Sequence, residues 1–229
     1  MTTPVSPPSS FSERLRSAGI EPGDSEELRL NKSLLMLATG LVCLMMMIWV
    51  AVYNLLGLNF SSDLPLLFQL VLVGNVLLYI YTRHFDFFRV TQFGLFLFLP
   101  FFAQWSAGNL IVSSGVILWG ALAPIGAILC IGARESLGWF IAWIALTAIS
   151  GGVDYYLADP LMIQKPIVTT RTTLLFLTLN FIAVATISYA LLRFAIEQRR
   201  RAQERLEQSR KQVQMAKNAA DTFFATPLV

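Results

Sequence analysis

The sequence predicts an all-α integral membrane protein, a six-helix transmembrane bundle with a long cytoplasmic C-terminal helix. Two observations concern composition: 55% of the 229 residues are hydrophobic and only 14% are charged, whereas soluble domains carry about 25% charged residues. The third is that the hydrophobic residues gather into six runs close to the length a helix needs to cross a membrane. Helices are favoured over strands because a helix pairs its own backbone polar groups in lipid.

The elements follow in order along the chain. Residues 1–32 are rich in Pro and Ser and then acidic, without an apolar core, so we expect a largely disordered cytoplasmic segment rather than a secretory signal. Residues 33–192 form the membrane domain, and residues 193–229 form a cytoplasmic helix. The six predicted spans are residues 34–56, 64–81, 87–105, 115–131, 137–157 and 170–192.

Two of these spans carry local features. Pro100 lies inside the third span and Pro124 inside the fourth, where each can bend its helix. The fourth span also carries small residues, which predict close contact with neighbouring helices; they are Gly120, Ala123, Gly126 and Ala127.

Positive charge orients the spans. The outer loops are residues 57–63, 106–114 and 158–169, and the first two contain neither Lys nor Arg. The positive-inside rule therefore places both termini in the cytoplasm. The basic residues on the inner side are Arg29, Lys32, Arg83, Arg89, Arg134, Arg193, Arg199, Arg200 and Arg201.

Several chemistries are disfavoured by the residues present. Cys43 and Cys130 both fall in apolar runs, and His84 is the only histidine, so we expect neither a metal site nor a cofactor. Residues 193–217 contain eight Lys/Arg and three Glu, a net charge of +5. Because this excess lies next to the last span, we expect contact with membrane lipid headgroups and no nucleic-acid binding.

The spans contain few ionisable groups, whereas such groups mark the ion pathways of transporters and channels. A small transporter or channel is therefore the weakest of the three functions that we consider. Asp154 lies near the outer end of the fifth span, where water reaches it. Neutral polar residues in or beside the spans predict hydrogen bonds between helices or, alternatively, a pocket for an amphiphilic ligand. The candidate pocket residues are Gln104, Trp105, Asn109, Ser113, Ser114 and Trp119.

The C-terminal stretch carries a weak heptad repeat. Two series of residues with spacing seven interleave at spacings of three and four, as the a and d positions of a coiled coil do. We therefore expect a homodimer seam that can pass small shifts of the sixth span along the helix. The seam residues are Ala202, Leu206, Ser209, Val213, Ala216, Ala220 and Phe223.

Three segments resemble the six-span N-terminal membrane region of bacterial signalling proteins, namely class III adenylate/guanylate cyclases and sensor histidine kinases. They are residues 19–30 (GIEPGDSEELRL), residues 104–109 (QWSAGN) and residues 113–127 (SSGVILWGALAPIGA). The resemblance implies a sensor or anchor region in a bacterial inner membrane. In such proteins a helical linker and a catalytic domain follow.

The end of the chain departs from that pattern. Residues 219–226 look like the lead-in to a histidine kinase dimerisation helix, and Pro227 and Leu228 look like the residues after its phosphoacceptor box. The box with its histidine is not in this sequence, so the resemblance brings no kinase or cyclase activity to any residue. We expect a module without catalytic activity of its own.

Two functions therefore lead. The first is a membrane sensor or anchor module that passes a signal from the bundle to the C-terminal helix. The alternative is a structural accessory subunit of a larger membrane complex, such as a pigment or respiratory assembly, to which 17 Phe and five Trp offer apolar packing surface.

Overall fold

The computed structural model describes residues 19–57, 64–156 and 170–225. The expectations for residues 1–18, for most of the first and third outer loops and for Pro227 lie outside these residues. The chain divides into two compact units, Met1–Leu191 and Leu192–Val229.

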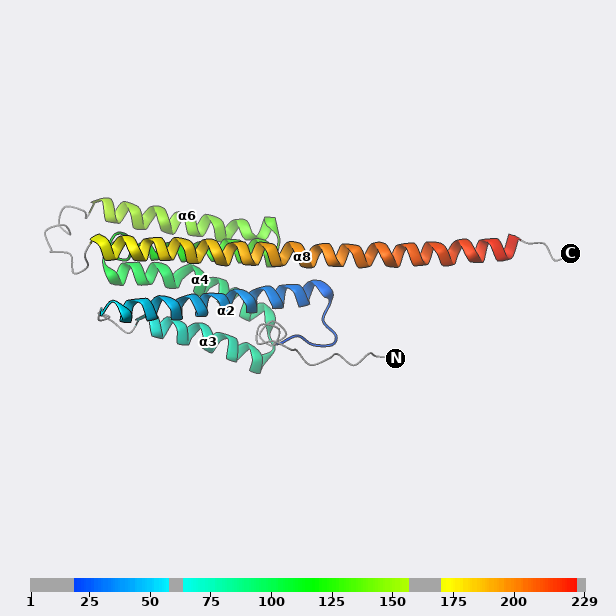
Figure 1. Ribbon diagram of the computed structural model, residues 1–229, viewed down its shortest axis with the longest axis horizontal. Coiled ribbons are helices and arrows are strands. Elements are labelled where there is room, and N and C mark those ends of the chain that lie inside the picture. Colours follow the sequence, from blue (N-terminus) through cyan, green and yellow to red (C-terminus); the bar gives the residue numbers. More distant parts are fainter. Residues whose placement is uncertain (1–18, 58–63, 157–169, 226–229) are drawn as a thin grey trace. The chain divides into compact units, whose positions relative to one another are not determined.

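The described residues are helical. The elements are α2 (Glu26–Leu55), α3 (Leu64–Thr82), α4 (Phe85–Ala107), η1 (Val116–Ala121), α5 (Leu122–Cys130), α6 (Ala133–Tyr156) and α8 (Thr170–Ala225). Five helices in the described part of the chain are long and apolar enough to cross a membrane. Within the first unit, successive helices run in opposite directions (Figure 1), so the chain returns to the same end after every second helix.

The first predicted span is longer than expected, because α2 begins at Glu26 and not near residue 34. The Ser25 hydroxyl accepts a hydrogen bond from the Leu28 N–H at 3.2 Å, and Glu26 and Glu27 occupy the first turn. A side-chain cap and early acidic residues both favour a helix start. The boundary that we predicted between residues 32 and 33 therefore falls inside a helix.

The fourth predicted span is not one α-helix. Residues 116–121 form the 3₁₀-helix η1, and residues 122–130 form the short α-helix α5. Gly115 before η1 has a φ of 68°, in the left-handed region, and Pro124 has no N–H to continue an α-helical ladder from η1. Pro100, in contrast, lies inside α4, which continues through it.

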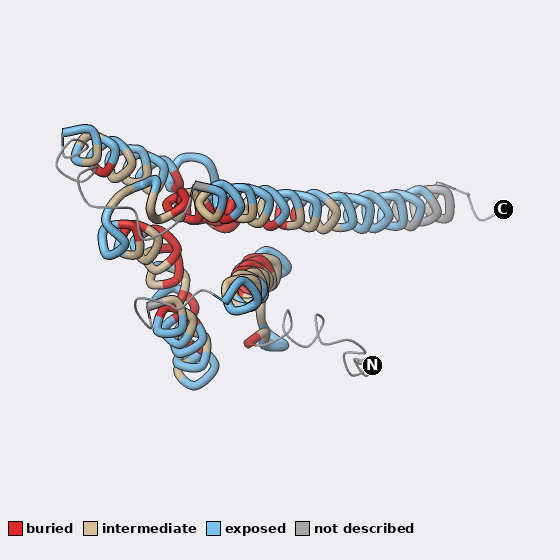
Figure 2. Tube along the Cα trace, turned by 60° about the vertical axis from the view of Figure 1, so that its left-hand side comes forward, coloured by how far each residue is buried: buried red, intermediate tan, exposed pale blue. Residues whose placement is uncertain are grey.

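Helix α4 lies at the centre of the first unit, where it packs against α3, η1, α5 and α6. The small residues of the fourth span allow close contact, as predicted: a Cβ atom on Gly126 would lie 2.9 Å from the Phe93 ring, and one on Gly120 would lie 3.1 Å from the Phe101 ring. Ala123 and Ala127 are fully buried. Figure 2 shows the buried residues on the sides of the helices that face one another.

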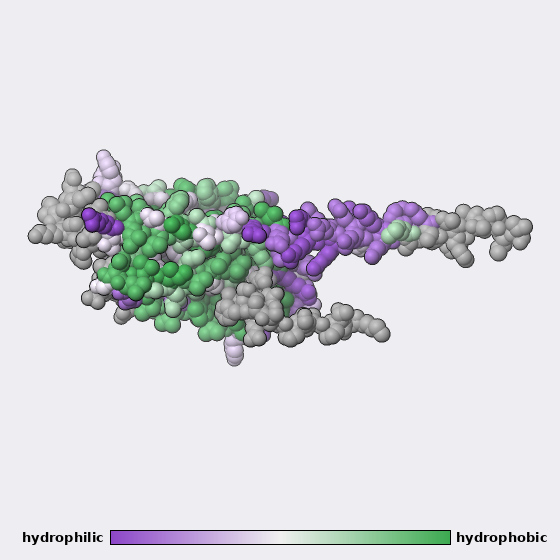
Figure 3. Space-filling view, viewed as in Figure 1, coloured by the Kyte–Doolittle hydropathy of each residue, from purple (hydrophilic) through white to green (hydrophobic). Residues whose placement is uncertain are grey.

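The outer surface of the bundle is apolar. Large hydrophobic side chains are more than half exposed on several helices, among them Leu70 on α3, Ile141 on α6 and Phe181 on α8. Hydrophobic residues dominate the face of the bundle seen in Figure 3, whereas hydrophilic residues dominate the C-terminal part of α8. A continuous apolar surface of this kind fits a membrane protein.

Polar side chains join α2, α3 and α4 inside the bundle. The fully buried Gln92 on α4 accepts a hydrogen bond from the Asn75 amide at 2.7 Å and donates one to the Thr39 hydroxyl at 2.9 Å. Thr91 donates to Asn75 Oδ1 at 3.0 Å. One glutamine therefore connects three helices.

Replacing this glutamine by leucine tests the connection. Gln92→Leu leaves the Asn75 amide and the Thr39 hydroxyl each short of one partner, so we expect the free energy of unfolding to fall by about 1–2 kcal/mol. Gln69→Leu on α3 is the matched control, since the half-buried Gln69 makes no side-chain hydrogen bond among the described residues. Unfolding in mixed detergent, followed by circular dichroism, measures both; equal losses would contradict the role of Gln92.

Candidate functional site

The ends of α4 and α6 meet in a polar cluster, which we call the loop-end cluster (Gln104, Trp105, Leu110, Ser150 and Asp154). The Gln104 Nε2 donates to Asp154 Oδ2 at 3.2 Å, and the Leu110 N–H donates to the same oxygen at 2.7 Å. The Trp105 indole N–H donates to the Ser150 hydroxyl at 3.0 Å. A carboxylate on α6 thus fixes both α4 and the loop that follows it.

Helix geometry explains why these five residues meet. Gln104 and Trp105 lie in the last turn of α4, and Gly108, which follows the helix, has a φ of 117°. Ser150 and Asp154 are four residues apart on α6, so they lie on one face, about one turn apart. Each of the two α4 side chains therefore reaches a different turn of the same α6 face.

Two buried polar atoms near this interface have no hydrogen-bond partner among the described residues. Gln104 is only 1% exposed, and its Oε1 accepts no hydrogen bond. The Trp143 indole N–H, earlier on α6 than Ser150, donates none. Orphaned buried polar atoms of this kind are rare and call for an explanation.

A second group of contacts fixes α8 to the loop and to η1; we call it the α8 clamp (Ser114, Trp119 and Asn180). The Trp119 indole N–H donates to Asn180 Oδ1 at 3.0 Å, and the Asn180 amide donates to the Ser114 carbonyl at 2.8 Å. All three residues are buried. Both functional atoms of one amide on α8 are therefore used to hold the start of the irregular segment.

The backbone at the clamp is unusual. Ser114 and Gly115 are consecutive residues with positive φ angles, 54° and 68°. A Cβ atom on Gly115 would lie 2.6 Å from a methyl group of Leu177 on α8, so glycine is required both by the conformation and by the space. The positive φ at Ser114 costs about 1–2 kcal/mol, which the hydrogen bond from Asn180 to its carbonyl helps to offset.

Aromatic packing adds to the clamp from α2. The buried Phe176 ring on α8 lies with its centroid 4.9 Å from that of Trp49 and 5.4 Å from that of Tyr53. Aromatic pairs at such distances contribute about 0.5–1.5 kcal/mol beyond the burial of their area. The first part of α8 is therefore held by α2 as well as by η1.

The structure places the predicted pocket residues in three sets of contacts. Gln104 and Trp105 bond to α6, whereas Trp119 and the Ser114 carbonyl bond to α8. Asn109 and Ser113 make their hydrogen bonds within the loop, Asn109 Oδ1 with the Val112 N–H and the Ser113 hydroxyl with the Leu110 carbonyl. The first and third sets are linked by Asp154, which accepts from both Gln104 and the Leu110 N–H, and no described side-chain hydrogen bond joins either of them to the contacts with α8.

The predicted dimer seam lies on α8. Leu206 and Val213 are 62% and 66% exposed, and Ser209 is also exposed, so these side chains are free to meet a partner. Ala202 is half-buried. The backbone of the remaining seam residues is helical, but their side chains lie outside the described ones: Ala216, Ala220 and Phe223.

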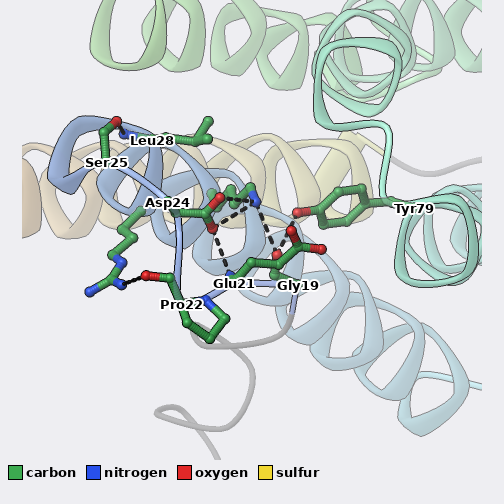
Figure 4. A network of polar contacts seen from close by, with 9 residues as sticks. Gly19, Glu21, Pro22, Asp24, Ser25, Leu28 and Tyr79 are labelled. Atoms are coloured by element: carbon green, nitrogen blue, oxygen red, sulfur yellow. Dashed lines mark hydrogen bonds and ion pairs between the residues drawn. The ribbon is translucent and has the colours of Figure 1, made fainter. Parts of the chain in front are cut away.

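At the opposite end of the bundle, Gly19, Asp24 and Tyr79 lie close together in a network of polar contacts (Figure 4), and Lys32 bonds to two of these residues. The Lys32 ammonium lies 2.8 Å from Asp24 Oδ2, and both side chains are more than nine-tenths buried. It also donates to the Gly19 carbonyl at 3.2 Å, which accepts a second hydrogen bond from the Tyr79 hydroxyl at 3.0 Å. We call these four residues the Lys32 cluster.

The ionisation of Asp24 stabilises this cluster. The N–H of Glu21, 2.7 Å from Asp24 Oδ2, and the ammonium of Lys32 hold the pKa of Asp24 below its usual range. Because the folded-state pKa is the lower one, the stabilisation is present above the unfolded pKa of about 3.9. It is lost as the pH falls through the folded-state value.

The sequence indicates several polar residues of these clusters, but it does not indicate the residues to which they are hydrogen-bonded. Asp154 and Asn180 appear among the polar residues of the spans, but nothing in their spacing pairs them with Gln104 or Trp119. Gln92 and Lys32 are buried centres of their networks, yet the sequence shows them only as a polar residue in a span and as a flanking charge. The signal that the sequence offers for these residues is a polar side chain within or beside an apolar run.

The described residues hold no group of three or more His, Cys, Asp or Glu side chains that could bind a metal ion. No protein-family model matches the chain, and no curated protein or solved structure is significantly similar to it.

Two tryptophans allow a matched test of the α8 clamp. Trp119→Phe removes the hydrogen bond to Asn180 and strands a buried amide oxygen, so we expect the free energy of unfolding to fall by about 1 kcal/mol or more. Trp143→Phe removes an indole N–H that donates to no described group. Circular dichroism during detergent unfolding should show the larger loss for Trp119→Phe; the reverse order would argue against the clamp.

Two glycines in one loop test the Lys32 cluster. Gly19 has a φ of 79°, and a Cβ atom there would lie 2.5 Å from the Tyr79 ring, whereas a Cβ atom on Gly23 would meet nothing within 4 Å. We expect Gly19→Ala to cost about 1–3 kcal/mol locally and Gly23→Ala much less. Hydrogen–deuterium exchange of the peptide over residues 19–30 should be faster only in the first variant; equal exchange would show that the loop is not held at Gly19.

Proposed function

We propose that this chain is a membrane sensor or anchor module of a bacterial signal-transduction protein. In this proposal the bundle spans the inner membrane and changes in it are passed to the C-terminal part of α8. No catalytic activity is assigned to the described residues. The observation that carries the proposal is that α8 is a single helix, Thr170–Ala225, which bears both an apolar spanning section and the predicted heptad.

The contacts of the first part of α8 support a transmitting role. Asn180 is bonded to the backbone of the strained Ser114–Gly115 turn and to Trp119 of η1. A 3₁₀ segment inside a bundle often marks a hinge. A change in the loop between α4 and η1 would therefore act directly on a side chain of α8, without an intermediate helix.

Charge supports the proposed orientation. The turn between α3 and α4, the turn between α5 and α6 and the start of α2 lie at one end of the bundle (Figure 1). Arg83, Arg89 and Arg134 lie at or next to these turns. By the positive-inside rule this end faces the cytoplasm, with both termini on that side, and the loop-end cluster faces the opposite side.

The polar pairs of α8 support a homodimer. In the predicted heptad, Arg200 and Glu204, which lie 3.5 Å apart, occupy positions b and f. Arg201 with Glu197 and Gln214 with Asn218 also fall on positions b, c and f. These pairs leave the a and d positions unused, where Leu206 and Val213 are exposed. An apolar a/d stripe opposite a charged face is the pattern of a two-stranded coiled coil.

Cysteine cross-linking tests the dimer. Cys43 and Cys130, the two cysteines of the chain, are first replaced by alanine, and Val213→Cys or Lys211→Cys is then added. Val213 occupies a predicted a position and Lys211 an outward f position, so only the first pair of thiols should come within disulfide reach. Oxidation in native membranes followed by denaturing electrophoresis should give a strong dimer band for Val213→Cys only.

Equal bands for both cysteines, or no band for either, would rule out the proposed seam.

The same membranes, solubilised in mild detergent, address the accessory-subunit alternative. That alternative is favoured by α6, since only 11% of its most apolar 18 residues are buried within the bundle, which leaves a long surface for lipid or for another subunit. Co-purification with a larger assembly at fixed stoichiometry supports it, whereas a homodimer alone argues against it.

A further inference from the structure

The carboxylate of Asp154 is only partly used by its described neighbours. Both of its hydrogen bonds, from Leu110 N–H and from Gln104 Nε2, go to the same oxygen, Oδ2. None of the ion pairs between described residues involves Asp154. It also lies in the last turn of α6, where the negative end of the helix dipole disfavours an anion. This position therefore favours an added positive charge.

Gln104 presents a second unsatisfied acceptor on the same side chain that touches Asp154. Its amide is planar, so the Nε2 atom that binds Asp154 and the orphaned Oε1 atom are fixed relative to each other. The neighbouring carboxylate has no hydrogen to give to Oε1. The cluster thus combines a carboxylate oxygen that accepts no hydrogen bond from a described residue with a buried amide oxygen that lacks a donor, and a buried acceptor without a donor is unfavourable.

Trp105 adds an aromatic surface beside these acceptors. Its indole N–H is fixed by Ser150, one turn before Asp154 on the same face of α6, and its side chain is 51% exposed. An indole that is fixed in place, half exposed and about one helical turn from a carboxylate favours the binding of a cation, because the ring face attracts positive charge.

A multivalent metal ion fits this cluster poorly. Calcium and magnesium require six or more oxygen ligands, whereas the cluster offers one carboxylate and one free amide oxygen. A primary ammonium fits better, because it carries a single charge and three N–H donors. The cluster lies at the ends of two apolar helices, the depth at which lipid headgroups meet a membrane protein.

We propose that the loop-end cluster binds the primary ammonium of a membrane lipid headgroup. The ammonium donates to Asp154 and supplies the hydrogen that Gln104 Oε1 lacks, while Trp105 lies against its charge. This proposal rests on the proposed function, since it names the class of ligand for the receptor module. The shared chemistry is the primary ammonium, and a soluble amine is the other source that the experiment must separate.

Native mass spectrometry of the purified full chain in detergent tests the site. The chain is incubated with phosphatidylethanolamine or with phosphatidylcholine of identical acyl chains, which carries a positive charge but no N–H donor. We expect about tenfold greater retention of phosphatidylethanolamine, since only its ammonium can donate charged hydrogen bonds to Asp154 and Gln104. Equal retention of the two lipids by the unaltered chain overturns the proposal, whether or not any variant folds.

Two matched variants locate the binding. Asp154→Asn removes the charge but keeps an acceptor for the Leu110 N–H, and it should abolish the preference for phosphatidylethanolamine. Asp86→Asn makes the same change at an exposed aspartate at the start of α4, in an ion pair with Arg89, and should leave the preference intact. Retention of the preference in Asp154→Asn, or its loss in both variants, would overturn the assignment.

Ethylammonium chloride distinguishes the two sources of the ammonium. Displacement of phosphatidylethanolamine only at concentrations far above that of the lipid supports a lipid headgroup as the ligand. Displacement at equal concentration overturns the lipid part of the proposal and assigns a soluble amine. Cross-linking of Val213→Cys in the Asp154→Asn background separates this outcome from the proposed function, because a dimer that persists without the lipid preference leaves the receptor module standing.

Discussion

The arrangement of the bundle depends on the pairing of a small number of buried polar side chains. Dispersion and apolar burial hold the helices together but do not select one register, since a lipid tail packs as well against leucine as another helix does. Gln92 joins α2, α3 and α4, Asn180 joins α8 to the loop before η1, and Asp154 joins α6 to α4. Each is a single residue with two or more partners, so the loss of one side chain releases more than one contact.

The same constraint explains where irregular backbone is tolerated. Residues 113–121 leave the α conformation within an apolar bundle, which is costly unless the freed backbone groups find partners. Here the carbonyl of Ser114 is bonded to Asn180, the N–H of Gly115 to the Leu110 carbonyl and the N–H of Leu118 to the Gly115 carbonyl. Burial of Gly120 and Trp119 then shields the segment within protein.

The sequence was sufficient for what depends on composition and length, and insufficient for what depends on pairing. Runs of apolar residues predicted the long helices, and small residues on the fourth span predicted its close contacts. The same run did not predict η1, because a proline in an apolar run is also compatible with one continuous helix, as Pro100 in α4 shows. Asp154 and Gln104 are 50 residues apart, and one sequence has no local signal for such a pair. The heptad and the resemblance to signalling proteins stay predictions.

The Lys32 cluster has a consequence for how the protein is made. Asp24 and Lys32 are eight residues apart, so they can pair as soon as the start of α2 has been synthesised. Tyr79, which bonds to Gly19 in this cluster, is synthesised later, because it follows Gly19 by 60 residues. At 5–20 residues per second this interval lasts about 3–12 s. During that time the ion pair is hydrated and weak. The loop before α2 therefore stays open at first and closes only when α3 has been made and lies beside it.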